Sequence, residues 1–423
     1  MSRTANRYST AYSGNTAAEP KWQEPNIEPE NPEPVSDAEP KQKRGVIDLP
    51  FLVLTLIILL IGVVMVLSAS FARAYYLHGN PLRFFTRQFI FAVAGIGILF
   101  VVTRLSVNFM KQFSFWLLIG SVALLAAVLV FGTTVNGARR WIDLGFTTFQ
   151  PSEIAKLAVI MSYSAMICQF DKKMKTFKYG IFPFVMISGI IIAFLMFQPH
   201  VSAAIIIVAQ TAIMMFAGGA RLRWFVVPIL IASLVTGYFI SSIQPGEDGQ
   251  PARQMEGRLR HVQRRITSWQ NPELDPQGAG FQARQSLYAV GSGGLFGQGL
   301  GQSRQKHLFL PEEHNDFIFA IVAEELGFIG SMMILSLFAL LIIRGFWLAL
   351  HAKDRFGSLV ITGITALLAI QVFLNVAVVT NLIPATGISL PFFSYGGTAL
   401  WIQLIKVGII LAISRDIPLT KAG

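Results

Sequence analysis

Charged residues are scarce in this sequence. Asp, Glu, Lys and Arg make up only 13% of its 423 residues, whereas a soluble domain carries about 25%. Hydrophobic residues make up 53%, and the mean hydropathy is positive. A chain with so few charges cannot cover itself with polar groups as an ordinary soluble domain does. The composition therefore predicts a membrane protein.

Cysteine is nearly absent, and acidic residues are fewer than basic ones. The single cysteine, Cys168, excludes an intrachain disulfide, and we expect a free thiol inside an apolar segment. The net charge of +11 does not indicate a nucleic acid partner, because Lys and Arg lie mostly at the ends of apolar segments rather than in one basic stripe. No signal peptide is expected, since the first apolar segment begins only after residue 45.

Residues 1–44 are rich in Pro, Glu, Ser and Asn and contain few aromatic side chains. Such a composition cannot bury enough apolar surface to offset the entropy of ordering the chain. We therefore expect a disordered tail, and both a contact with a cytoplasmic protein and a plain spacer remain open as its role.

Apolar segments long enough to cross a bilayer follow the tail, each close to the required length of about 20 residues. They predict an all-α polytopic membrane protein with ten transmembrane helices. These are expected at residues 46–69, 87–104, 112–132, 151–169, 179–198, 201–219, 224–243, 315–344, 357–381 and 397–414.

The orientation follows from Lys and Arg in the short loops, which are retained on the cytoplasmic side. One alternating set of helix ends holds most of them, so we expect both termini in the cytoplasm. Residues 45–415 then form the transmembrane domain, with a large outward loop at 244–314 between helices seven and eight and a cytoplasmic end at 416–423. Every polar motif falls at the outer ends of the helices, whereas a channel or transporter more naturally has polar groups at mid-membrane or on both sides.

Two polar motifs lie at the start of the predicted fourth helix and just before it. In "FQPSEIAKL", Glu153 and Lys156 lie three residues apart on one helix face, which suits either a cavity lining or a structural pair at the interface. In "NGARRWIDLG", Arg139 and Arg140 suit either a phosphate oxygen or a lipid headgroup. The stretch "MEGRLRHVQRRITSWQ" predicts a basic amphipathic helix on the outer surface, with an anionic partner or plain solvation both open.

The rest of the large loop is rich in glycine, without the flanking strand and helix of a nucleotide-binding motif. Lys306, His314 and Asp316 lie near the start of the eighth helix. Within that helix, we expect one of Glu324 and Glu325 to point into the bundle, rather than both into lipid. Asp275 precedes Pro276, and this Asp-Pro step is a turn signal. Glu273 is also a rival for any acid-base role.

These stretches, with "DPQGAGFQARQSL", "GQGLGQSRQKHLFLPEEHNDFIFAIVAEELG" and "IPATGISLPFFSYGGT", resemble the SEDS family of bacterial cell-wall polymerases over nearly all of residues 46–415. "GQSRQKHLFLPE" is more similar to the division and sporulation members than to the elongation members. One departure is "FQPHVSAA", where many members carry an acidic residue after the proline and a glycine further on. His200 and Ser202 put any role for that segment in doubt.

The resemblance implies ten transmembrane helices and a glycosyltransferase that polymerises lipid II during septal wall synthesis. Its active site faces outward from the bacterial cytoplasmic membrane, and its partners are a class B penicillin-binding protein and other division proteins. The family's essential loop aspartate matches Asp275, and its cavity glutamate and lysine match Glu153 and Lys156. The substrate-binding candidates are Arg139, Arg140, Glu153, Lys156, Gln282, Ser286, Lys306, His314, Asp316 and Ser394.

Polymerisation with inversion needs a general base and cations that stabilise a departing lipid pyrophosphate. We expect Asp275 to be the base and Arg139, Arg140, Lys156 and Lys306 to meet the pyrophosphate. No metal site is assigned. A divalent cation is a candidate for sharing the charge, although no dense carboxylate cluster calls for one. The alternatives from other classes are a lipid II flippase, which would be indifferent to Asp275, and a non-catalytic division scaffold, which has no need of Glu and Lys within helices.

Overall fold

The computed structural model describes residues 45–135, 138–145, 147–221, 223–225, 260–271 and 278–417. Almost all of the seventh expected helix, residues 224–243, lies outside these ranges, as do residues 1–44 and 418–423. Asp275 and its rival Glu273 also lie outside the described residues. The expectations that concern these parts of the chain stay predictions.

Long apolar helices dominate the described residues. Eight of them are long and apolar enough to cross a membrane, and α7 is a shorter apolar helix. The predicted all-α polytopic class is confirmed, whereas the count of ten stays a prediction. The helices within these eight spans, together with α7, are α1 (Leu49–His78), α2 (Arg83–Val102), α3 (Val107–Phe131), α4 (Pro151–Phe170), α6 (Phe182–Phe197), α7 (Val201–Ala217), α11 (Ile318–Leu350), α12 (Arg355–Val379) and α13 (Gly397–Ser414).

Several helices extend past their predicted limits, and α1 is the clearest case. It starts where the Asp48 carboxylate accepts a hydrogen bond from the Phe51 N–H (2.9 Å) and Pro50 occupies the first turn. It continues to His78 and stops at Gly79, whose φ of 66° is left-handed. The prediction ended this helix at residue 69 because the apolar pattern fades there, but helical geometry continues until a capping residue ends it.

Short elements connect the long helices. The 3₁₀ helix η1 (Asp171–Lys175) and α5 (Phe177–Gly180) follow α4, while α9 (Arg260–Gln270) and α10 (Ala279–Ser292) belong to the large loop. A small antiparallel sheet precedes α4, in the order β1 (Thr133–Val135), β2 (Ala138–Asp143) and β3 (Thr148–Phe149). No strand is predicted from the sequence around "NGARRWIDLG". β1 and β2 form where β-branched and aromatic residues flank the turn sequence Asn136-Gly137.

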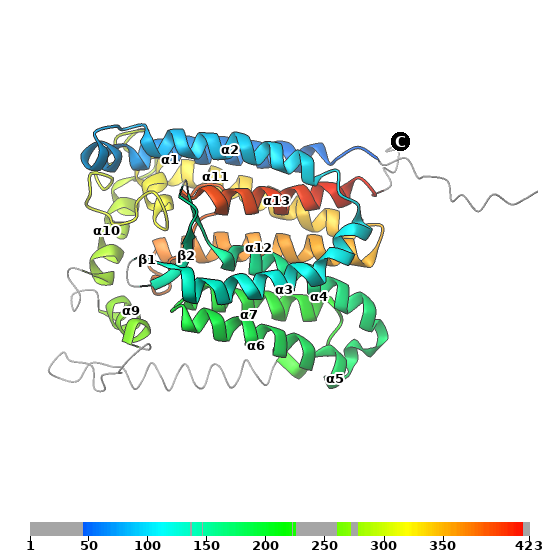
Figure 1. Ribbon diagram of the computed structural model, residues 1–423. Coiled ribbons are helices and arrows are strands. Elements are labelled where there is room, and N and C mark those ends of the chain that lie inside the picture. Colours follow the sequence, from blue (N-terminus) through cyan, green and yellow to red (C-terminus); the bar gives the residue numbers. More distant parts are fainter. Residues whose placement is uncertain are drawn as a thin grey trace, which may run out of the picture. The chain divides into compact units, whose positions relative to one another are not determined.

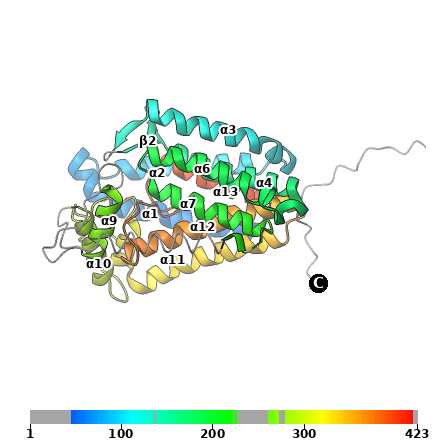
Figure 2. The same cartoon turned by 90° about the horizontal axis from the view of Figure 1, so that it is seen from below.

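The long helices run side by side, and the polar connections gather at one end of them (Figure 1). The strands, α9 and α10 lie at the end where α4 begins and α1 finishes, and Figure 2 shows the same grouping from below. At the other end the Gly45 N–H donates to the Arg415 carbonyl (2.9 Å), so the first and last described residues lie on one side. The predicted convergence of the polar motifs on one end of the bundle is therefore observed.

Helix α11 is interrupted at Gly327, where φ is 67° and ψ is −167°. A glycine-rich segment, residues 293–301, lies against the interruption. It forms hydrogen bonds with the backbone N–H and C=O groups that are not bonded within the helix there. Non-helical backbone inside a membrane protein requires such internal partners. The four hydrogen bonds run from Gln298 N to Glu324 O (2.9 Å), Gly299 N to Glu325 O (3.0 Å), Phe328 N to Gly294 O (2.8 Å) and Ile329 N to Leu295 O (3.1 Å).

We expect Gly327→Ala to destabilise the protein by about 1–3 kcal/mol or more. Its φ is left-handed, and an added Cβ would lie 2.3 Å from the backbone nitrogen of Gly297. The apparent melting temperature of the detergent-solubilised protein measures the effect. Gly189→Ala is the matched control, because a Cβ at that helical position meets nothing within 4 Å. Equal melting temperatures for the two variants would contradict the tight pairing at Gly327.

Candidate active site

A buried carboxylate between two ammonium groups lies near the polar end of the bundle. Glu153 and Lys156 are in the first turns of α4 and are 7% and 3% exposed. The Lys156 ammonium contacts Glu153 Oε1, and the ammonium of Lys406, on α13, lies 3.6 Å from Oε2. These three side chains, which we call the Glu153 cluster, carry one more positive charge than negative charge.

Lys406 was missed by the sequence analysis. Its signal was present, because a lysine in the middle of the apolar stretch "LWIQLIKVGIIL" is costly in lipid and marks a functional or paired position. Its ammonium donates to Gln403 Oε1 (3.3 Å), and Gln403 Nε2 donates to Gln371 Oε1 on α12 (3.0 Å). The Glu153 cluster therefore ties α4, α13 and α12 together through polar side chains.

A small cavity of ≈ 30 Å³ adjoins this cluster. That volume has room for about two water molecules and is far below the several hundred Å³ of a typical ligand pocket. Glu153, Gln403 and Ser394 supply polar groups to its wall. The lining residues are Glu153, Ser389, Leu390, Pro391, Phe392, Ser394, Tyr395, Ala399, Leu400 and Gln403.

The adjacent arginines of β2 have different environments. Arg140 is partly buried, and its guanidinium donates to the carbonyls of Gln198 (3.5 Å) and Pro199. Arg139 is exposed and donates from Nε to Thr134 Oγ1 (3.3 Å). Side chains alternate between the two faces of a strand, so only one of two neighbours can turn inward.

Arg265 of α9 is a second residue that sequence reasoning did not single out, although it lies in the predicted basic helix. Its guanidinium donates to the carbonyl of Ala385 (2.9 Å). Burial lowers the pKa of Arg140 and of Arg265, and the charge of Arg265 lowers the pKa of Arg140 further. The two guanidinium groups therefore act on each other from separate elements.

Asp316 lies within the electrostatic reach of both arginines. Burial, with the nearby Glu312, raises the pKa of the Asp316 carboxyl to about 6, against the opposing charges of Arg265, Arg140 and His314. The structure thus brings Asp316 and Arg140, both predicted site residues, into one electrostatic group with Arg265.

Three further predicted site residues bind backbone carbonyls of other segments. Ser286 Oγ donates to Val379 O (2.7 Å), Gln282 Nε2 to Pro311 O (3.4 Å) and Ser394 Oγ to Asn315 O (2.8 Å). These bonds hold α10 and the segment after α12 in place. Of the three, Ser394 also lines the cavity.

His314 belongs to a third charged group, together with Glu313 and Arg73. The Arg73 guanidinium donates two hydrogen bonds to the Glu313 carboxylate, at 2.6 and 3.0 Å. His314 Nδ1 lies 3.6 Å from Glu313 Oε1. Burial would raise the pKa of the Glu313 carboxyl, but the hydrogen bonds and charge of Arg73 and the nearby His314 outweigh it, so the pKa of Glu313 is lowered. The imidazole of His314 packs against the rings of Phe84 and Tyr395, which also contact each other.

Lys306 has different partners from those of Lys156. Its ammonium binds Glu325 Oε1 (3.0 Å) and the carbonyl of Gly301 (2.5 Å). Both Glu324 and Glu325 are buried at 1% exposure, whereas the sequence predicts that one of them points into the bundle.

The doubtful segment after α6 is buried. His200 is 6% exposed and lies 3.5 Å from Gln150 Nε2, while the hydroxyl of Ser202 donates to the carbonyl of Thr386. Within the described ranges, no three His, Cys, Asp or Glu side chains are grouped as metal ligands would be.

Together the fold and the charged clusters define a polytopic membrane protein with a polar, partly buried site at one end of its helices. The profile of the FtsW, RodA and SpoVE family of cell cycle proteins matches residues 48–417, and the chain belongs to this family. It is similar to stage V sporulation protein E of Bacillus subtilis, with 42% identity over 371 residues that cover 87% of this chain and 97% of that protein. It is also similar to a probable peptidoglycan glycosyltransferase FtsW of Geobacter sp. strain M18, with 39% identity over 87% of this chain and 96% of that protein.

Solved structures show the same fold. A chain from a peptidoglycan synthase complex that coordinates polymerization and crosslinking matches with a TM-score of 0.70 and 25% identity, over 88% of this chain and 99% of that chain. The rod shape determining protein RodA of Thermus thermophilus matches with a TM-score of 0.61 and 26% identity, over 88% of this chain and 97% of that chain.

We expect Glu153→Gln to destabilise the protein by about 3–5 kcal/mol, because it leaves two lysines buried without a carboxylate. Lys406→Met is the matched comparison, because Glu153 then keeps Lys156 as its partner. The loss of stability in Lys406→Met should be clearly smaller than in Glu153→Gln. Thermal unfolding in detergent at pH 7 measures both variants. A larger loss for Lys406→Met would contradict the shared-carboxylate arrangement.

Stability should also depend on the ionisation of Asp316. The folded pKa of about 6 lies above the ordinary value of 3.8, so the folded carboxyl holds its proton more tightly than the unfolded one. This contribution is fully present below pH 3.8 and is lost as the pH rises through about 6. The melting temperature of wild type should therefore fall relative to Asp316→Asn between pH 4 and 7. If the melting temperatures of the two proteins varied with pH in parallel, the raised pKa assigned to Asp316 would be wrong.

Proposed function

We propose that this chain is a peptidoglycan glycosyltransferase that polymerises lipid II into glycan strands on the outer face of the bacterial cytoplasmic membrane during septal wall synthesis. The observation that carries the proposal is the Glu153 cluster, whose excess positive charge adjoins a cavity. Such a site suits the pyrophosphate of a lipid-linked sugar. The curated relatives named as probable peptidoglycan glycosyltransferases support the activity.

In the proposed reaction, the sugar 4-hydroxyl of one substrate molecule attacks the anomeric carbon of a second. The new carbon–oxygen bond forms as the bond from that carbon to the pyrophosphate breaks, so the configuration inverts and lipid pyrophosphate leaves. Asp275 takes the hydroxyl proton as general base. Cationic groups neutralise the charge that develops on the departing pyrophosphate.

The described residues take different parts in this reaction. Arg140, Lys156 and Lys406 are the cations that we assign to the pyrophosphate, and Glu153 holds the two lysines without reacting. Exposed Arg139 meets the ligand or the lipid headgroups from the outer side. The remaining candidates, Gln282, Ser286, His314, Asp316 and Ser394, shape the surrounding walls. Because the cavity is smaller than a sugar, substrate binding requires it to widen.

A class B penicillin-binding protein is the proposed partner, since crosslinking must follow polymerisation to make a wall. The similarity to a chain of a peptidoglycan synthase complex supports this pairing. Other division proteins are proposed as further partners, in keeping with the similarity to proteins named FtsW.

The direct test is glycan-strand formation from purified lipid II by the protein reconstituted with its penicillin-binding partner. Removing a general base typically costs about 10²- to 10⁴-fold in rate, so we expect Asp275→Asn to lose polymerisation by at least that factor. Glu273→Gln is the matched control two residues away and should retain activity. Normal polymerisation by Asp275→Asn, with lipid II moved across vesicle membranes, would instead favour the flippase.

A further inference from the structure

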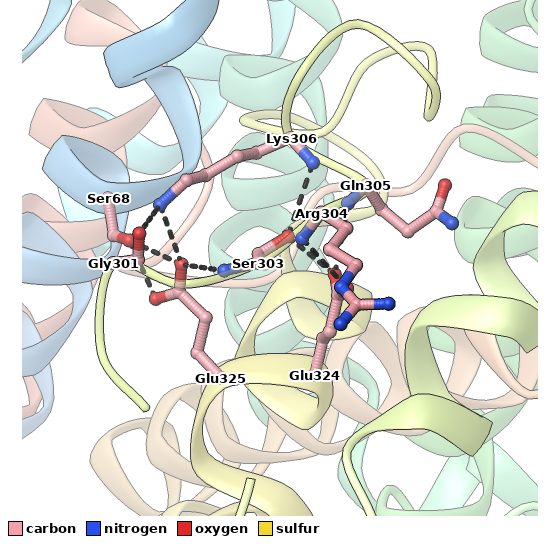
Figure 3. Close-up of polar contacts among 8 residues, drawn as sticks. All are labelled: Ser68, Gly301, Ser303, Arg304, Gln305, Lys306, Glu324 and Glu325. Carbon is pink, nitrogen blue, oxygen red and sulfur yellow. Dashed lines mark hydrogen bonds and ion pairs between the residues drawn. The ribbon is translucent and has the colours of Figure 1, made fainter. Parts of the chain in front are cut away.

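A further buried charge cluster, which shares no residue with the Glu153 cluster, lies at the interruption of α11. We call it the α11 clamp; it consists of Ser68, Ser303, Lys306, Glu324 and Glu325 (Figure 3). Ser68 comes from α1, the two glutamates from α11, and Ser303 and Lys306 from the segment after α10. All five side chains are at least nine-tenths buried.

Each glutamate of the clamp receives several donors. Glu324 accepts from the hydroxyl of Ser303 (2.5 Å) and from the backbone N–H groups of Arg304 (2.9 Å) and Gln305 (3.3 Å). Glu325 accepts from the Ser68 hydroxyl, with its two oxygens 2.7 and 2.6 Å away, from the Lys306 ammonium (3.0 Å) and from the Ser303 N–H (3.3 Å). The two carboxylates therefore fix the backbone of residues 303–305 and join it to α1.

The clamp and the break in α11 act on the same stretch of chain. The backbone bonds hold residues 294–299 against the break, and the carboxylates hold residues 303–306 immediately beyond. At Gly293 an added Cβ would lie 2.0 Å from the carbonyl of Ala323, so the end of α10 is pressed directly on α11. The C-terminal end of α10 is thus fastened to α11 by two successive sets of contacts.

Stability alone does not account for such a cluster. A buried ion pair usually contributes little net free energy, because desolvation offsets the attraction, and apolar residues of similar volume often serve as well. Directional hydrogen bonds also fix the position of the backbone to which they bind. Here that backbone follows α10, a helix of 14 residues whose first residue, Ala279, lies four positions after Asp275 in the sequence.

We infer that the α11 clamp is a positioning device for glycosyl transfer, in which Glu324 and Glu325 set the placement of α10, the helix that follows the base Asp275 in the chain. Lys306 then serves as a partner of Glu325 and does not bind the pyrophosphate. This inference rests on the proposed function, because it requires Asp275 to be the base. A misplacement of about 1 Å in a reacting group can cost about 100-fold in rate.

The test uses the full-length protein with its penicillin-binding partner and lipid II. The triple variant Ser68→Ala/Lys306→Met/Glu325→Met replaces the ionic part of the clamp by apolar side chains. We expect kcat to fall about 100-fold, with the KM for lipid II and the melting temperature close to wild type. Lys306→Arg keeps the charge and the donors and should retain most of the activity, and Ser68→Ala, which leaves no charge unpaired, should lower kcat less than the triple variant does.

A second ion pair between the same two helices provides the matched control. At the opposite end of the bundle, Arg344 on α11 binds Asp48 at the start of α1, at 3.1 and 2.5 Å. Asp48→Asn/Arg344→Met should change stability while leaving kcat unchanged. An equal loss of kcat in this control would overturn the inference, because any weakening between α1 and α11 would then suffice.

The remaining outcomes separate the inference from the proposed function. Normal kcat in a folded triple variant, with Asp275→Asn inactive, overturns the positioning role alone. If the triple variant fails to fold, an unchanged kcat in Ser68→Ala overturns it as well. Full activity of Asp275→Asn overturns the proposed function and leaves the clamp with no base to position.

Discussion

Inside a bilayer, each charge and each backbone polar group must find its partner within the protein, and the arrangement of this bundle depends on that constraint. Where α11 leaves helical geometry at Gly327, residues 293–301 supply the missing hydrogen bonds. Where α4 carries Glu153, lysines from α4 and α13 surround the carboxylate. Both arrangements join segments that are distant in the sequence, so the contacts that satisfy polar groups also fix the tertiary structure.

The two buried charge clusters satisfy this constraint differently. In the α11 clamp, hydroxyl, ammonium and backbone donors converge on both carboxylates, and the result is a closed set of bonds. In the Glu153 cluster, two ammonium groups share one carboxylate beside a cavity. A cluster whose polar groups all bond to one another suits the fixing of a backbone segment. A cluster with a surplus of positive charge suits the binding of an anionic ligand. The proposed division between positioning and binding follows from this difference.

Much of the fold was predictable because hydrocarbon imposes a simple length rule. The apolar segments gave nearly all the described long helices, and Pro151 correctly marked the start of α4. The site was harder to predict. Lys406 becomes a partner of Glu153 only when α13 packs near α4, and Gly327 looks like any helical glycine until residues 293–301 pair with it. Such contacts depend on tertiary packing, which local sequence patterns do not contain.

The arginine pair of β2 shows where local pattern and tertiary structure meet. In the sequence, Arg139 and Arg140 are equivalent, and either suits a phosphate or a lipid headgroup. The strand makes them different, because alternation turns Arg140 toward the carbonyls that precede α7 and leaves Arg139 exposed. Once Arg140 is inside, its charge acts on Asp316 together with that of Arg265 from α9. A three-stranded sheet that contributes little to the core thus decides which cation joins the buried site.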